Sequence, residues 1–117
     1  LFFTRTPAGI RAGKEFLLRL RERTEGRDKE ITVAALQAQL KALRLWGNKA
    51  PADLSKIHHP VLVANGDNDR MVPSKNTHDL AQRLPNSELI IYPDSGHGAV
   101  FQFHADFVPK ALEFLAR

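Results

Sequence analysis

Titratable side chains gather in two short loops in the second half of the chain. The first loop, residues 66–73, carries Asp67 and Asp69, and the second, residues 93–98, carries His97. An aspartate beside a histidine holds the imidazole in one tautomer and stabilises its protonated form, as a histidine general base requires. The residue types therefore indicate acid–base chemistry, provided that the fold brings the two loops together.

Each loop follows a short apolar run typical of a buried strand. Residues 60–64 (Pro-Val-Leu-Val-Ala) precede the first loop, residues 89–92 (Leu-Ile-Ile-Tyr) precede the second, and residues 74–84 between them have helical spacing. A strand, a helix and a strand in this order form a right-handed βαβ unit with parallel pairing, which places both loops at one edge of the sheet. We therefore predict an α/β fold with two parallel strands and flanking helices, in which an aspartate of the first loop, Asp67 or Asp69, approaches His97.

Three more helices are expected around this unit. Thr6, next to a proline, is a good N-cap for the first helix, and Thr32 is one for the second, which Gly47 ends. A last helix that begins near Asp106 tolerates Pro109 in its first turn, where N–H groups lack helical partners. The first helix is expected to bury an apolar face formed by Ile10, Gly13, Phe16, Leu17 and Leu20.

The two loop regions resemble the acid and histidine segments of α/β-hydrolases. Residues 57–73 (Ile-His-His-Pro-Val-Leu-Val-Ala-Asn-Gly-Asp-Asn-Asp-Arg-Met-Val-Pro) are similar to the acid-bearing strand and loop of that family, and residues 89–98 to its last strand and histidine loop. The resemblance implies a triad in the chain order Ser, Asp, His. It assigns Asp69 as the acid, with Asp67 as the runner-up, and His97 as the base. It also implies a small-molecule substrate with an ester or similar acyl bond, and neither a metal nor an organic cofactor.

The serine of such a triad has no counterpart in these 117 residues. The chain lacks a G-x-S-x-G elbow, and Ser74 best fits a helix N-cap. A two-stranded parallel sheet also cannot cover its own edges. We therefore expect a C-terminal fragment of a serine hydrolase that is inactive by itself, with a helical cap or lid segment over residues 1–50 and the C-terminal βαβα part of the core over residues 51–117. The remaining serines are Ser55, Ser87 and Ser95.

The same residues leave other hypotheses open. The chain is alternatively a non-catalytic α/β-hydrolase-like binding module that self-associates through an exposed strand edge. Asp67 and Asp69 alternatively cap a turn, or bind a divalent cation together with His97. The cation hypothesis is weakened because Met71 stands where an EF-hand loop needs an oxygen ligand.

Composition excludes several classes of protein. Apolar residues at 43% and charged residues at 26% are values of a globular domain, and the absence of cysteine excludes a disulfide framework and a thiolate nucleophile. No apolar run is long enough to span a membrane and no secretion signal opens the sequence, so cytoplasmic is the default localisation. Residues 1–50 carry a net charge of +6, but their basic and acidic side chains interleave as on a solvated helix face, which argues against nucleic acid as a partner.

Overall fold

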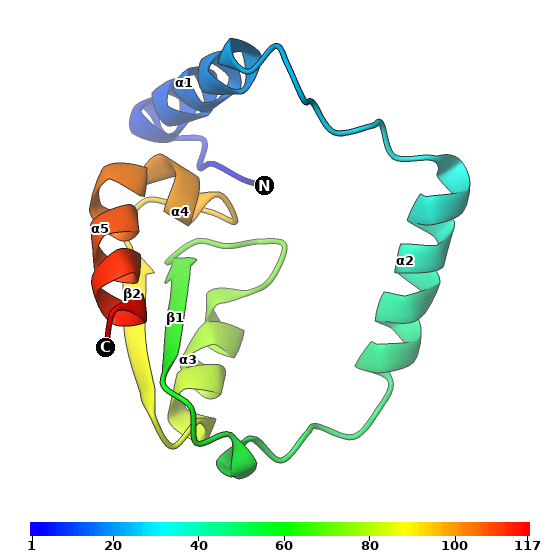
Figure 1. The fold of residues 1–117 in the computed structure, drawn as a ribbon, viewed down its shortest axis with the longest axis vertical. Helices are drawn as coiled ribbons and strands as arrows, with labels where there is room; N and C mark the ends of the chain where they lie inside the picture. Colours follow the sequence, from blue (N-terminus) through cyan, green and yellow to red (C-terminus); the bar gives the residue numbers. More distant parts are fainter. The chain divides into compact units, whose positions relative to one another are not determined.

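The computed structural model describes residues 1–117, which form two compact units. Residues Leu1–Glu22 pack with Leu54–Arg117 in the first unit, and Arg23–Asp53 form the second. The first helix therefore belongs to the same compact unit as the two strands. The elements in chain order are α1 (Pro7–Glu22), α2 (Val33–Gly47), the 3-10 helix η1 (Leu54–Lys56), β1 (Val61–Gly66), α3 (Ser74–Arg83), β2 (Ser87–Tyr92), α4 (Ala99–Gln102) and α5 (His104–Leu115) (Figure 1).

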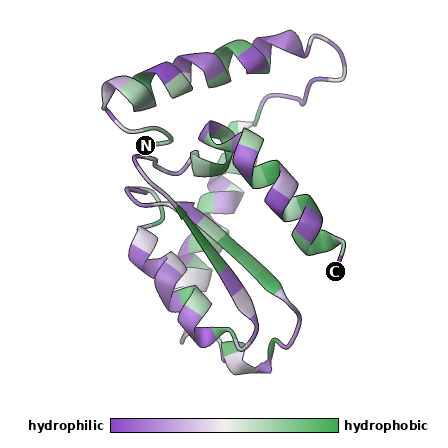
Figure 2. Ribbon diagram, turned by 90° about the vertical axis from the view of Figure 1, so that its left-hand side faces the viewer, coloured by the Kyte–Doolittle hydropathy of each residue, from purple (hydrophilic) through white to green (hydrophobic).

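The two strands form the parallel sheet that the sequence predicts. β1 pairs with β2 from Val61 opposite Ser87 to Gly66 opposite Tyr92. Both strands are rich in apolar residues, and α3 and α5 lie on opposite faces of the pair (Figures 1 and 2). Because the pairing is parallel, the loops that follow Gly66 and Tyr92 emerge at the same edge. The buried apolar side chains of the core are Val63, Leu84, Tyr92 and Ala99.

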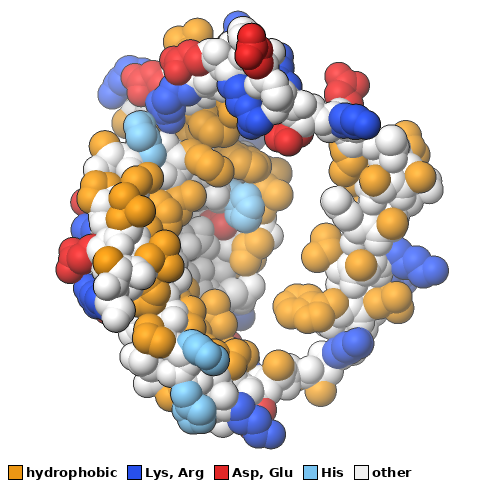
Figure 3. Space-filling view, in the orientation of Figure 1, with side chains coloured by type: hydrophobic (Ala, Val, Ile, Leu, Met, Phe, Trp, Pro, Cys, Tyr) orange, Lys and Arg blue, Asp and Glu red, His pale blue; other side chains and the backbone are white.

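Both predicted N-caps of the first half are present. The hydroxyl of Thr6 accepts a hydrogen bond from the Gly9 N–H at 3.0 Å, and that of Thr32 accepts one from the Ala35 N–H at 3.1 Å. α2 ends at Gly47 as expected. Its apolar side chains lie on the surface of the second unit (Figure 3), and the exposed ones are Val33, Leu36, Leu40, Leu43, Leu45 and Trp46.

Only part of the apolar face expected for α1 is packed against the rest of the chain. Ile10, Leu17 and Leu20 are each at least half exposed. The helix packs through Phe16, which belongs to the expected face and whose ring lies 5.6 Å from that of Phe3 and 5.1 Å from that of Phe101 between centroids. Gly13 leaves room for this contact, since a Cβ there would lie 3.2 Å from the Phe3 ring. The prediction is confirmed for Gly13 and Phe16 and is wrong for Ile10, Leu17 and Leu20, because the helix is packed against Phe3 and Phe101 rather than along its whole apolar stripe.

The C-terminal helix begins earlier than predicted. A short helix α4 follows the histidine loop, and α5 begins at His104 rather than near Asp106. Pro109 is therefore the sixth residue of α5, where it removes one helical hydrogen bond. Tyr92 anchors this helix to the sheet, because its hydroxyl donates to the Asp106 carboxylate at 2.8 Å and its ring stacks on Phe103. Burial, together with the Asp106 carboxylate, raises the pKa of Tyr92 to about 12. No helix combines the length and apolar character needed to cross a membrane.

Candidate active site

An Asp–His pair occupies the edge of the sheet where the two strands end. The Asp69 Oδ2 atom lies 2.9 Å from the His97 Nδ1 atom. The side chain of Asp69 is 1% exposed and that of His97 is 34% exposed. The βαβ topology thus brings together the two residues that the sequence analysis singled out, one buried and one accessible from solvent.

The other oxygen of Asp69 binds the backbone of its own loop. Asp69 Oδ1 accepts hydrogen bonds from the N–H groups of Met71 at 2.8 Å and Val72 at 3.0 Å. Burial alone would raise the pKa of Asp69, but the hydrogen bonds from His97, Val72 and Met71 together outweigh it and lower the pKa below its ordinary value of 3.8. Asp69 is therefore held as a carboxylate with its second oxygen directed at the imidazole.

Ser74 supports this loop in a way that the sequence did not reveal. Its hydroxyl donates to the carbonyl of Gly66 at 2.6 Å and accepts from the Asp69 N–H at 3.2 Å. The predicted N-cap role is wrong, because Pro73 occupies the cap position of α3 and Ser74 is the first helical residue. A serine at the start of a helix is normally a cap. The hydrogen bond from Ser74 to Gly66 depends instead on the close approach of β1, which the sequence does not show.

Backbone hydrogen bonds hold the two loops against each other. The N–H of Asn68 donates to the carbonyl of Ser95 at 3.0 Å, and the N–H of Asp67 donates to the carbonyl of Tyr92 at 2.9 Å. The Asp67 carboxylate accepts from the Ser95 N–H at 3.3 Å. Asp67 therefore joins the loops and has no hydrogen bond to His97, and Asp67, Asp69 and His97 do not form a group able to hold a metal ion.

The N-terminal segment positions the histidine loop, which the sequence analysis missed. The N–H of His97 donates to the carbonyl of Leu1 at 3.1 Å, and the N–H of Gly98 donates to the carbonyl of Phe2 at 2.7 Å. The Phe2 ring meets the His97 ring edge to face, with centroids 5.3 Å apart. The one available signal was the glycine on each side of His97, because glycines permit another backbone to approach closely. A Cβ on Gly96 would lie only 2.5 Å from the Leu1 carbonyl oxygen.

A second set of contacts joins the residues just before α1 to the start of the same loop. The Thr6 hydroxyl donates to the Asp94 carboxylate at 2.7 Å, and the Thr4 hydroxyl donates to the Asp94 carbonyl at 3.3 Å. Hydrogen bonds from Thr6 and then Thr4 lower the pKa of Asp94. Asp94 has a φ of +46°, a left-handed conformation that aspartate adopts more readily than most residues. The loop that carries His97 is thus bonded to the N-terminal segment both at Asp94, before the histidine, and at His97 and Gly98.

The geometry of the pair determines what the imidazole can do. A carboxylate only accepts hydrogen bonds, so neutral His97 must carry its proton on Nδ1 to bind Asp69. The Nε2 atom is then free to accept a proton, and the adjacent carboxylate stabilises the imidazolium that results. A cavity of about 260 Å³ borders the pair and is lined by Val63, Ala64, Asn65, Val72, Thr77, Leu80, Ala99 and Val100 in addition to Asp69 and His97.

The lowered pKa of Asp69 predicts how stability depends on pH. A carboxyl group whose pKa is lower in the folded state stabilises the fold above its unfolded pKa, and that contribution is lost as the pH falls through the folded pKa. We therefore expect the urea midpoint of the wild type to fall below about pH 4. Asp69→Asn removes the stabilisation that the Asp69 carboxylate contributes. The difference between the urea midpoints of the wild type and of Asp69→Asn must therefore shrink as the pH falls.

The control for this series is Asp67→Asn, because the exposed Asp67 side chain accepts a single hydrogen bond, from the Ser95 N–H at 3.3 Å. Asp67→Asn is expected to follow the wild-type pH profile. A difference between wild type and Asp69→Asn that stays constant down to about pH 2 contradicts the prediction, since at that pH an ordinary aspartate is protonated.

Comparison with known proteins identifies the family. The family described as alpha/beta hydrolase fold matches residues 10–103. An alpha/beta hydrolase fold protein from Chitinophaga pinensis superposes with a TM-score of 0.93 at 38% identity, over 97% of this chain and 42% of that one. The crystal structure of a serine hydrolase involved in carbazole degradation superposes with a TM-score of 0.61 at 27% identity, over 71% of this chain and 33% of that one. A 2-hydroxy-6-oxononadienedioate/2-hydroxy-6-oxononatrienedioate hydrolase of Klebsiella pneumoniae is 36% identical over 85 residues, which are 73% of this chain and 28% of the relative.

The chain belongs to the α/β-hydrolase fold family. Its relatives include proteins named as hydrolases, which supports assignment to a hydrolase family. The chain spans 28% of the length of the Klebsiella hydrolase and 42% of the length of the Chitinophaga protein. The two parallel strands and their helices correspond to a part of the fold.

Proposed function

We propose that Asp69 and His97 are the acid and base of a Ser-Asp-His triad that cleaves an ester or similar acyl bond of a small molecule. The observation that carries this proposal is the 2.9 Å contact between the buried Asp69 carboxylate and Nδ1 of the more exposed His97. In this mechanism a serine hydroxyl attacks the substrate carbonyl carbon, and Nε2 of His97 takes the hydroxyl proton and passes it to the leaving group. Asp69 stabilises the imidazolium in between.

We place the nucleophile outside these 117 residues, in a longer polypeptide of which this chain is the C-terminal part. Three of the four serine hydroxyls of the chain donate to backbone carbonyls: Ser74 to Gly66, Ser87 to Ala81 and Ser95 to Tyr92. The fourth, Ser55, lies in the 3-10 helix η1. The fraction of the relatives that the chain spans also supports this proposal. In the same proposal, residues 1–50 belong to the cap that shapes the substrate pocket.

A fluorophosphonate probe tests the proposal, because it forms an adduct only with a serine whose hydroxyl is activated. The 117-residue chain is expected to stay unlabelled in an intact-mass measurement. A polypeptide that joins the chain to its upstream coding sequence is expected to gain one adduct, on a serine before Leu1. An adduct on a serine within the chain, or none on the longer polypeptide, contradicts the proposal.

A non-catalytic module that self-associates is the second candidate. It is favoured by the exposed apolar side chains of α2 and by a sheet of only two strands, each of which has an unpaired edge. Absence of labelling in the longer polypeptide, together with a concentration-dependent dimer in analytical ultracentrifugation, would favour this candidate over the hydrolase.

A further inference from the structure

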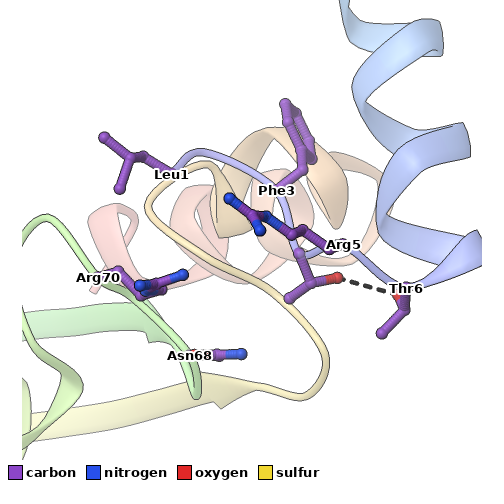
Figure 4. A pocket seen from close by; sticks show the side chains of 7 residues that line it. Leu1, Phe3, Arg5, Thr6, Asn68 and Arg70 are labelled. Atoms are coloured by element: carbon purple, nitrogen blue, oxygen red, sulfur yellow. Dashed lines mark hydrogen bonds between the residues drawn. The ribbon is translucent and has the colours of Figure 1, made fainter.

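A second cavity lies between the N-terminal segment and the loop after β1 (Figure 4). Its volume is about 540 Å³, roughly twice that of the cavity beside Asp69 and His97. Both of its walls belong to the first compact unit of the chain. The residues that line it are Leu1, Phe3, Thr4, Arg5, Thr6, Asn68 and Arg70.

Two unpaired cations face this cavity. Figure 4 shows the side chains of Arg5 and Arg70 extending toward each other from opposite walls. Neither guanidinium group takes part in any of the ion pairs or hydrogen bonds of the structure. The nearby carboxylates have other partners, since Asp69 binds His97 and Asp94 binds Thr6. Two guanidinium groups that share one cavity without a counter-ion attract a negative charge.

The walls of the cavity are fixed relative to each other. The segment that carries Arg5 is bonded to the histidine loop through the carbonyl of Leu1, and the loop that carries Arg70 is bonded to it through the N–H of Asn68. The Thr4 hydroxyl, also in the lining, lies 3.0 Å from the Thr6 hydroxyl. The backbones that carry the two arginines are thus positioned before any ligand binds, which lowers the entropy cost of binding.

The remaining lining side chains indicate the kind of anion. Leu1 and Phe3 supply apolar surface, while Asn68 supplies an amide that both donates and accepts hydrogen bonds. Guanidinium groups bind a planar carboxylate through two parallel hydrogen bonds. A fully hydrated inorganic anion would gain nothing from the apolar wall, whereas a short hydrocarbon chain attached to a carboxylate would.

We propose that this cavity binds a small organic carboxylate, with the carboxylate between Arg5 and Arg70 and the hydrocarbon part against Leu1 and Phe3. The cavity shares no lining residue with the one that borders Asp69 and His97. It does not depend on the proposed hydrolase activity, because it requires no nucleophile and is tested by binding alone.

Titration of the ¹⁵N-labelled chain with valerate, followed by NMR, tests the proposal. Saturable shifts are expected at the N–H signals of Arg5, Asn68 and Arg70, with a dissociation constant on the order of 1–10 mM at low salt. Valeramide, which has the same shape and no charge, is expected to cause no saturable shift. The affinity is expected to fall as NaCl is added, because both arginines lie at the surface.

Variants assign the binding to the two arginines. Arg5→Gln and Arg70→Gln are each expected to weaken valerate binding by about fivefold or more. Arg11→Gln, on the exposed surface of α1 and outside the lining, is the matched control and should change the affinity by less than about twofold. If Arg70→Gln loses its dispersed NMR spectrum, Arg70→Lys replaces it and should bind with intermediate affinity.

Three results would overturn the proposal. The first is the absence of saturable shifts with valerate up to about 50 mM. The second is an equal loss of valerate affinity in Arg11→Gln and in the two cavity variants, which would show that valerate binding depends only on the net charge of the chain. The third is equally tight binding of valeramide or of inorganic phosphate, which would rule out an organic carboxylate as the preferred ligand.

Discussion

Replacing Asp69 with asparagine is expected to lower kcat by about 10³- to 10⁴-fold in a polypeptide that unites this chain with its nucleophile. The carboxylate accepts a hydrogen bond from Nδ1 of His97, whereas the asparagine amide also has N–H groups to donate. His97 would then carry its proton on Nε2, where it cannot accept one from a serine. The measurement is kcat for a simple ester such as p-nitrophenyl acetate.

The substitution should change the chemistry without breaking the loop. The Oδ1 atom of asparagine can still accept the hydrogen bonds from the N–H groups of Met71 and Val72 that Asp69 Oδ1 now accepts. A ¹⁵N NMR spectrum of the imidazole in the 117-residue chain reports the tautomer independently of activity. At a pH where the imidazole of His97 is neutral, the wild type should show the Nδ1–H form and Asp69→Asn the Nε2–H form.

Asp67→Asn is the matched control. The Asp67 carboxylate is exposed and accepts only the Ser95 N–H, so its replacement is expected to change kcat by less than about threefold. Wild-type activity in Asp69→Asn, or an equal loss in both variants, would contradict the assignment of Asp69 as the acid. A changed tautomer with unchanged kcat would show that the pair exists but does not catalyse.

The meeting of the two loops could be predicted because each step depends on local sequence and a general rule of topology, whereas the choice of Asp69 over Asp67 came from the resemblance to α/β-hydrolases. Two apolar runs with a helix between them require parallel strands, and parallel strands bring their following loops to one edge. The loop that begins after Gly66 and the loop that begins after Tyr92 meet there, as their backbone hydrogen bonds show. The caps at Thr6 and Thr32 were predictable for the same reason, since a cap is defined within four residues.

The support of His97 by Leu1 and Phe2 could not be predicted in this way. These contacts join residues about 95 positions apart in sequence, and neither the apolar start of the chain nor the glycines around His97 specify a partner. The same difficulty applies to Ser74, whose hydroxyl bonds to Gly66 on the preceding strand. Sequence patterns report periodicity and capping, whereas these interactions depend on which segments the whole fold brings together.

Gly66 is where the fold and the candidate site depend most directly on one another. It ends β1, and a Cβ at this position would lie 2.2 Å from the carbonyl oxygen of Ser95 and 2.5 Å from its carbonyl carbon. Both atoms belong to the backbone, so no rotamer change can relieve the clash. Moving the histidine loop away would break its hydrogen bonds with Asp67 and Asn68 and separate the backbones that hold Asp69 and His97 together.

Gly66→Ala is therefore expected to lower the free energy of unfolding by about 2–3 kcal/mol, which is the cost of overpacking at a site where the clashing atoms belong to the backbone. Urea unfolding followed by far-UV circular dichroism measures this change. The matched control is Gly47→Ala at the end of α2, where a Cβ would meet no atom within 4 Å and where alanine favours the helix by up to about 1 kcal/mol. Equal midpoints for the two variants would show that the two loops can separate at little cost, and that the close contact of Gly66 with Ser95 does not hold the pair in place.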